Sequence, residues 1–296
     1  MKEIMKLWLV AFCVQCCMAC TDSDPVNGEF EPLGLEYELP QGKSDADDRI
    51  VDFYNKYSSL ILYDYPALEW NYEFGSQGYI DYVYELPDPA YVGEALDFLE
   101  DIWFDFFPEE FNREFIPYKI LLAGKFTSTY NNSAMPLLYA SKDAVMFGFC
   151  SDTLRNLTPE TKQVIKRDLF SKALSFWMLE IEIPEEFYAI SDYSSAATED
   201  PSSPDYARKR GFVADYSYVD YYGPSEWCTW VDWLTGMLNK TSDMLAYLTG
   251  MTHRTSNDWK ADWEYPLVKQ KYDILRNFFI EKYDVDLQKI GDAVYE

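Results

Sequence analysis

The sequence predicts an α+β fold, formed as a single domain by residues 45–296. Short apolar or β-branched runs of strand length occur between residues 60 and 149, beside segments with helical periodicity. From residue 158 onward only helical patterns and polar loops remain, and no internal repeat is visible. Helices mixed with a few strands, followed by helices alone, are typical of the α+β class.

The first half contains two amphipathic helices and three strand candidates. Asp45–Tyr57 repeats apolar residues on one face, and Ser44 stands at its N-cap position. Val92–Phe107 carries a second apolar stripe at helical spacing. The strand candidates are Leu60–Tyr65, Pro117–Ala123 and Ala144–Phe149.

The second half begins with the most strongly marked helix. Thr158 supplies an N-cap, Pro159 occupies the first helical position and Glu160 is an acid in the first turn. The pattern continues to about Leu179, and Pro184 closes the region. Residues 191–210 are rich in Ser, Asp and Pro and predict a loop. Two more helices are predicted at Ser225–Tyr247 and Pro266–Tyr283.

The N-terminus predicts an exported lipoprotein. Residues 1–19 combine a basic start with a short apolar run at Leu7–Val14, too short to span a bilayer. Ala19 precedes Cys20, as in a bacterial lipobox, where cleavage leaves the cysteine to be acylated. Cys17 stands where that pattern prefers Leu. An ordinary secretory signal with incidental cysteines is the alternative.

The segment after Cys20 predicts an acidic, flexible tether over residues 20–44. Thr21-Asp22-Ser23-Asp24 resembles the export signal of surface lipoproteins in the Bacteroidetes. Pro and Gly recur through the rest of the segment, as in linkers. We therefore expect attachment to the outer membrane, at the cell surface.

Composition narrows the ligand classes. The formal net charge is −26, which repels phosphate backbones and excludes nucleic acid as a partner. Aromatic residues make up 18% of the chain. They serve either a large core or a surface on which sugars or peptides stack, and composition does not separate the two.

Two cysteines, Cys150 and Cys228, follow Cys20 in the exported part. In an oxidising compartment they could form a disulfide, or they could remain separate buried thiols.

Several segments together resemble a known family. Pro184–Ser191 (PEEFYAIS), Gly211-Phe212-Val213 with Tyr216, and Ser225–Thr229 (SEWCT) occur in the order and spacing of zinc metallopeptidase-like lipoproteins of the Bacteroidetes. Lys269–Ile290 is similar to that family's closing helix. The resemblance implies a zincin-like scaffold with a small sheet, an active-site helix and a helical C-terminal half. It also implies that the protein lies beside an outer-membrane nutrient-uptake system. Its partners would then be the transport receptor of that system and the lipoprotein that accompanies the receptor.

The family's zinc motif, H-E-x-x-H-x-x-H, is degenerate here. Counting back from Pro184 places its histidines at Ser171, Ser175 and Met178, and its glutamate at Lys172. Hydroxyl groups are not among the usual ligands of zinc, and a lysine cannot serve as the carboxylate base. We therefore expect neither bound zinc nor peptidase activity. In the acidic helix, Ser225 and Thr229 stand where the family has Glu, and Glu226 alone stays acidic.

No other catalytic set is evident. His253 is the only histidine and lies in a polar stretch, which predicts an incidental surface residue. Ser171 and Lys172 diverge on a helix, whereas Lys172 and Ser175 are three apart and could touch. Glu185 and Glu186 could form a glycosidase-like pair by position alone, and a solvated acidic turn is the simpler interpretation.

Three functions stay open. The first is a catalytically inactive peptidase-like lipoprotein that binds a peptide or glycan beside an uptake system. The second is a structural accessory subunit of that system. The third is a hydrolase with a non-standard site.

Overall fold

The computed structural model describes residues 37–75, 82–130, 132–141, 143–177, 180–226 and 234–295. The chain divides into two units, Met1–Glu38 and Leu39–Glu296, and nearly all described residues belong to the second. The predicted signal peptide, Cys20 and most of the predicted tether lie outside the described residues. Among the described residues, no helix has the length and apolar character needed to cross a bilayer.

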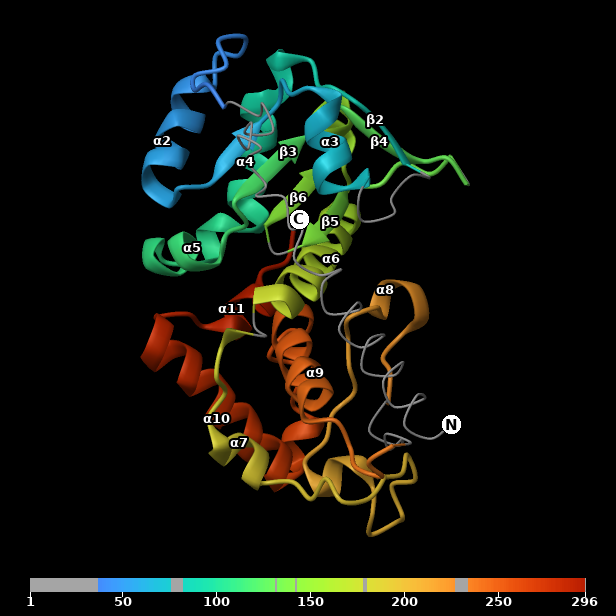
Figure 1. The fold of residues 1–296 in the computed structure, drawn as a ribbon. Coiled ribbons are helices and arrows are strands. Elements are labelled where there is room, and N and C mark those ends of the chain that lie inside the picture. Colours follow the sequence, from blue (N-terminus) through green and yellow to red (C-terminus); the bar gives the residue numbers. More distant parts are fainter. Residues whose placement is uncertain are drawn as a thin grey trace, which may run out of the picture. The chain divides into compact units, whose positions relative to one another are not determined.

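A four-stranded mixed sheet occupies the first half of the second unit (Figure 1). Its strands, in spatial order, are β1 (Leu60–Leu62), β3 (Lys119–Leu122), β6 (Ala144–Phe147) and β5 (Leu137–Ser141). The first three are parallel, and β5 runs antiparallel to β6 along the edge. Each of the parallel strands is fully buried, as expected where helices cover both faces. A separate antiparallel pair joins β2 (Tyr82–Glu85) to β4 (Lys125–Ser128).

Helices supply the rest of the first half. Those around the sheet are α2 (Asp47–Tyr57), α3 (Ala67–Glu73), α4 (Val92–Ile102) and α5 (Glu109–Phe115), with short 3₁₀ turns at η2 (Pro89–Tyr91), η3 (Phe104–Phe106) and η4 (Asp152–Asn156). In α4 the apolar stripe faces the sheet, where the rings of Phe98 and Phe147 lie 5.6 Å apart.

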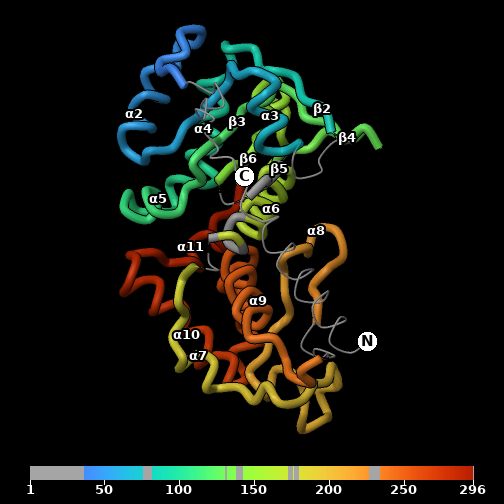
Figure 2. The backbone as a smooth tube through the Cα atoms, viewed as in Figure 1, coloured from blue at the N-terminus to red at the C-terminus, as the bar shows by residue number. Residues whose placement is uncertain are grey.

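The second half is helical in its described residues, as the yellow to red part of the tube in Figure 2 shows. Its α-helices are α6 (Pro159–Trp177), α7 (Glu185–Ala189), α8 (Val219–Tyr222), α9 (Lys240–His253), α10 (Pro266–Tyr283) and α11 (Leu287–Asp292). Two 3₁₀ turns, η6 (Ala207–Arg210) and η8 (Asp262–Glu264), lie between them. One hydrophobic cluster runs from Ala46 to Ile290, so the sheet and the later helices share a core.

The predicted α+β class is confirmed by this mixed architecture. The helix predicted at Pro266–Tyr283 has those bounds, and α6 begins at Pro159 as expected. The second predicted helix ends at Ile102, because Trp103 leaves the helical conformation before η3. Strand β1 ends at Leu62 rather than at Tyr65.

Two boundaries near the tether differ from expectation. Helix α2 begins at Asp47 with Ala46 as its N-cap, and Ser44 instead donates a hydrogen bond to the Pro89 carbonyl at 2.9 Å. The last residues of the predicted tether are bound to the folded unit, because the Gln41 amide donates to the Ile61 carbonyl at 3.0 Å.

The helix predicted at Ser225–Tyr247 is wrong in its first part. Ser225 forms an antiparallel bridge with Asp215, and Asn239 caps α9 by accepting hydrogen bonds from the amides of Thr241 and Ser242. The Asn239 cap is a stronger signal for the start of α9 than apolar periodicity is, because the periodicity extends into the residues before the helix.

Candidate functional site

Helix α6 carries the positions at which the sequence predicts a lost zinc site. Thr158 caps the helix, accepting a hydrogen bond from the Thr161 amide at 3.2 Å, and Pro159 occupies the first turn. These signals fix the phase of the helix and turn Ser171 inward, where its exposed fraction is 5%. The side chain of Ser175, like Met178 as a whole, lies outside the described residues.

Ser171 meets the only histidine of the chain. Its hydroxyl lies 2.7 Å from Nε2 of His253, at the end of α9, and Nδ1 of the same ring lies 2.8 Å from the Thr252 hydroxyl. Each ring nitrogen of the imidazole thus has one hydroxyl partner, Ser171 on α6 and Thr252 on α9.

The expectation that His253 is an incidental surface residue is wrong. Its exposed fraction is 7%, because α9 continues to His253 and turns the ring toward α6. Burial lowers the pKa of His253 to about 3, with a smaller contribution from the nearby cations Arg167 and Lys166. The ring is therefore neutral at physiological pH. The apolar run Met244–Met251 leads directly into His253, and this continuity was the available sequence signal.

The Ser171–His253 pair has the atoms of a nucleophile and a base but lacks the environment. A general base works best with a pKa near the operating pH, far above that of this imidazole. The third group in this series of hydrogen bonds is the Thr252 hydroxyl, where a catalytic triad has a carboxylate that stabilises the imidazolium. Both reacting groups are also buried. The pair therefore serves as a structural link between α6 and α9.

Lys172 does not take the place of a catalytic carboxylate. Its ammonium group lies 3.4 Å from the carboxylate of Asp168, one turn earlier on α6. Burial raises the pKa of Asp168, and Lys172 opposes that shift. A hydroxyl bonded to an imidazole and an ammonium group paired with an acid do not fit a zinc ion. Within the described residues, no group of three His, Cys, Asp or Glu side chains could hold a metal ion.

The segments that carry the family resemblance converge on a buried ion pair instead. Lys271 of α10 pairs with Asp243 of α9, and both side chains are fully buried. The carboxylate also accepts a hydrogen bond from the Tyr193 hydroxyl, and the Lys271 ammonium donates to Ser191 Oγ at 3.1 Å. Burial raises the pKa of Asp243, whereas the contact with Lys271 lowers it. These hydrogen bonds offset part of the cost of burying the charges, and the second carboxylate oxygen of Asp243, Oδ1, is buried without a hydrogen-bond partner among the described residues.

The motif residues of these segments form the walls around this ion pair. The Lys271 ammonium lies 4.4 Å from the ring centre of Phe187 and 5.0 Å from that of Phe212. Gly211 adopts a left-handed φ of 82°, and a Cβ there would approach Ser191 Oγ to 2.9 Å. Glycine is therefore required for the chain to pass. These segments build the core of the helical half rather than a reactive centre.

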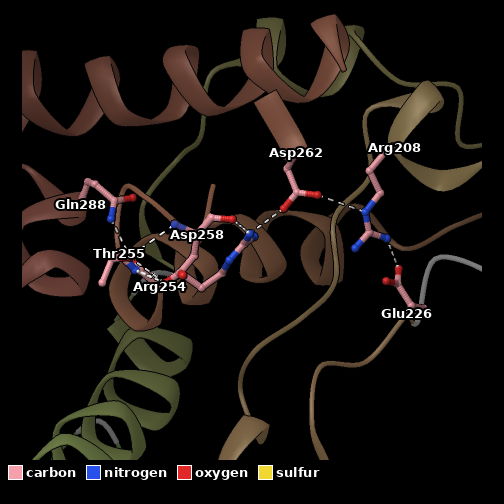
Figure 3. A network of polar contacts seen from close by, with 7 residues as sticks. All are labelled: Arg208, Glu226, Arg254, Thr255, Asp258, Asp262 and Gln288. Carbon is pink, nitrogen blue, oxygen red and sulfur yellow. Dashed lines mark hydrogen bonds and ion pairs between the residues drawn. The ribbon is translucent and has the colours of Figure 1, made fainter. Parts of the chain in front are cut away.

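A second network holds the acid that remains in the SEWCT segment (Figure 3). Glu226 pairs with Arg208, whose Nε lies 3.3 Å from Asp262, and Asp262 also pairs with Arg254 at 2.7 Å. The Arg254 guanidinium stacks 4.3 Å from the ring centre of Trp259. The Glu226 carboxylate is thus held in an ion pair with Arg208. Thr229 lies outside the described residues.

The remaining candidates are placed as follows. Cys150 is buried, and burial raises the pKa of its thiol to about 12. Cys228 lies outside the described residues, so its pairing with Cys150 stays a prediction. Glu185 and Glu186 are exposed on α7, and Glu185 lies 3.8 Å from Lys240. This is the solvated acidic turn rather than a carboxylate pair.

Comparison with known proteins gives one structural likeness. No family model matches the chain, and no curated protein matches it. A crystal structure described as "a putative zinc-binding metallo-peptidase from Bacteroides caccae" aligns with 86% of this chain and 92% of its own, at 12% identity and a TM-score of 0.48. A likeness at this level does not establish the family of the chain.

Proposed function

We propose that this chain is an outer-membrane lipoprotein, anchored through Cys20, whose metallopeptidase-like domain binds an extended peptide without cleaving it. The placement beside a nutrient-uptake system is part of the proposal and rests on the sequence resemblance. The observation that carries the binding function is the outer edge of the sheet at β5, next to helix α6, which pairs with no further strand among the described residues.

Strand β5 offers an edge on which a peptide can add as a further strand. Among the described strands it pairs with β6 only (Figure 1). The Gly148 amide donates to the Pro136 carbonyl at 2.7 Å, which marks those two residues as a hydrogen-bonded pair. Antiparallel pairing alternates, so the amide of Tyr139 points away from β6, toward a potential partner. Backbone hydrogen bonds to such an edge bind peptides of many sequences.

The residues of α6 support binding over cleavage. Ser171 is hydrogen-bonded to a neutral, buried imidazole, and Lys172 is paired with Asp168. Neither arrangement activates water. The peptide chain would therefore lie beside α6 intact.

Two measurements test the proposal that the domain does not cleave peptides: the zinc content of the purified protein and its activity on unfolded casein. We expect substoichiometric zinc and no chelator-sensitive proteolysis. Stoichiometric zinc together with such proteolysis would overturn it.

Binding is tested with fluorescein-labelled, unfolded casein peptides by fluorescence anisotropy. Tyr139→Pro removes one outward amide while remaining compatible with an edge strand. We expect it to weaken binding at least about tenfold, the equivalent of roughly 1.4 kcal/mol. The matched variant Tyr139→Val keeps the amide and should bind within about threefold of the wild type. Equal binding by the two variants would exclude strand addition at β5.

A further inference from the structure

A surface pocket of about 360 Å³ lies between the start of α6, the turn after α9 and the C-terminal residues. Gln163 and Arg167 of α6, His253 and Tyr295 are among its lining residues. Both ring nitrogens of His253 are engaged with Ser171 and Thr252, so the imidazole contributes only its carbon edge. The pocket thus combines ring surfaces with a few polar groups, the usual make-up of a small-molecule site.

Two of its polar atoms are buried without a partner. Among the described residues, nothing accepts from or donates to Gln163 Oε1 or the Tyr295 hydroxyl. A buried polar group without a hydrogen bond is costly, and native structures rarely leave one. Both atoms belong to residues that line the pocket, so a ligand bearing hydroxyl groups could satisfy them.

The cation that lines the pocket is already paired with an acid. Arg167 makes a two-pronged contact with Asp220 of α8, with Nε 2.8 Å from one carboxylate oxygen. Asp258 accepts hydrogen bonds from the Thr255 amide at 2.9 Å and from the Thr255 hydroxyl at 2.7 Å. Arg167 is therefore already paired with an acid, and the carboxylates of Glu160 and Asp258, which also line the pocket, repel an anionic ligand. The net charge of −26 further disfavours anions.

Arg167 also connects the pocket to a group of exposed tyrosines. Its partner Asp220 lies in α8, and the exposed fractions of Tyr218, Tyr221 and Tyr222 are 57%, 66% and 88%. The ring centres of Tyr218 and Tyr222 lie 6.5 Å apart, and those of Tyr221 and Tyr222 lie 6.4 Å apart. Three large rings held in water by one short helix present apolar faces with polar edges.

We propose that the pocket and the α8 tyrosines form one binding site for a neutral oligosaccharide. A sugar ring carries an apolar C–H face that stacks on tyrosine and hydroxyl groups that both donate and accept hydrogen bonds. The terminal sugar occupies the pocket at Gln163 and Tyr295, and the following sugars lie across Tyr221 and Tyr222. This site is separate from the β5 edge and does not depend on peptide binding there.

Isothermal titration calorimetry with maltohexaose, cellohexaose, xylohexaose and mannohexaose tests the proposal, with hexalysine and a hexagalacturonate as charged probes. We expect at least one neutral hexasaccharide to bind and neither charged probe to do so. The double variant Tyr221→Ala/Tyr222→Ala should weaken binding by at least about tenfold, and Gln163→Leu should weaken it by a similar factor.

Tyr130→Ala is the matched control, because Tyr130 is 93% exposed and lies outside α8, just after β4. It should leave affinity unchanged, and so should Tyr139→Pro. The absence of binding by all four neutral sugars at millimolar concentration would overturn the proposal. Full affinity in the tyrosine double variant, or tighter binding of a charged probe, would do the same.

Discussion

Ser171 and His253 join α6 to α9 through one buried hydrogen bond, and burial keeps the imidazole neutral. The pKa of His253 is about 3 in the folded protein, against an ordinary value of 6.5. Between these values the unfolded chain binds a proton that the folded protein does not. The stability contributed by the neutral ring is therefore complete above pH 6.5 and declines as the pH falls toward 3.

We predict that His253→Gln removes part of the acid sensitivity of the fold. Between pH 6 and pH 4.5, the free energy of unfolding of the wild type should fall more steeply than that of the variant, by up to about 1.4 kcal/mol per pH unit. Urea denaturation at several pH values measures this difference. Ser171→Ala keeps the histidine and should retain the wild-type slope despite lower stability. Parallel slopes in the wild type and His253→Gln would contradict the prediction.

The buried pair Lys271–Asp243 is a second place where one side chain carries a large part of the stability. Replacing Lys271 by Met leaves the Asp243 carboxylate buried without its counter-ion, which typically costs about 3–5 kcal/mol. Lys269→Met on the same helix is the control, because Lys269 pairs with Asp273 at the surface. That variant should change stability by less than about 1 kcal/mol. Similar urea midpoints for the two variants would argue against a structural role for the buried pair.

At the scale of elements, local signals predicted the long helices α2, α4, α6 and α10 but missed the short helices α3, α5, α7, α8 and α11 and did not predict the site. The Thr158-Pro159-Glu160 start of α6 and the Pro266 start of α10 are local, so the sequence contains them in full. The contact of Ser171 with His253 joins residues 82 positions apart, and no local pattern encodes it. Strand β5 was missed for a related reason, since it depends on pairing with β6 rather than on its own residues.

The packing of α11 on α9 gives an element-scale prediction. Gly291 lies so close to α9 that a Cβ would meet the carbonyl oxygens of Met251 and Arg254 at 2.2 Å. Gly291→Ala must therefore displace backbone, and we expect it to destabilise the fold by at least about 2 kcal/mol. Gly93→Ala in α4 is the matched control, because its Cβ would make an ordinary contact of 3.8 Å with Ala46.

The melting temperature should fall in Gly291→Ala and should not fall in Gly93→Ala. Alanine is favoured over glycine inside a helix by roughly 0.5–1 kcal/mol, so Gly93→Ala should be neutral or stabilising. Differential scanning calorimetry compares them directly. A melting temperature for Gly291→Ala equal to that of the wild type would show that α11 can move away from α9 without cost.

At the scale of the whole molecule, the proposed attachment to a membrane is not assisted by the charge of the chain. The net charge of −26 disfavours adsorption to anionic lipid, and no described helix is suited to crossing a bilayer. In the proposed lipoprotein, the anchor is a set of acyl chains on Cys20. More than one acyl chain is needed for stable anchoring, since a single chain binds only marginally.

We predict that Cys20→Ala releases the protein from the membrane fraction when it is expressed in a bacterium with lipoprotein processing. Wild-type protein should enter the detergent phase of a Triton X-114 partition and incorporate labelled palmitate, whereas Cys20→Ala should do neither. Cys17→Ala is the control, because Cys17 occupies the −3 position and would not be acylated. It should behave as the wild type. Detergent partitioning and palmitate incorporation that persist in Cys20→Ala, or are lost in Cys17→Ala, would assign the anchor to another residue. The placement of both proposed binding surfaces at the membrane would then have to be reconsidered.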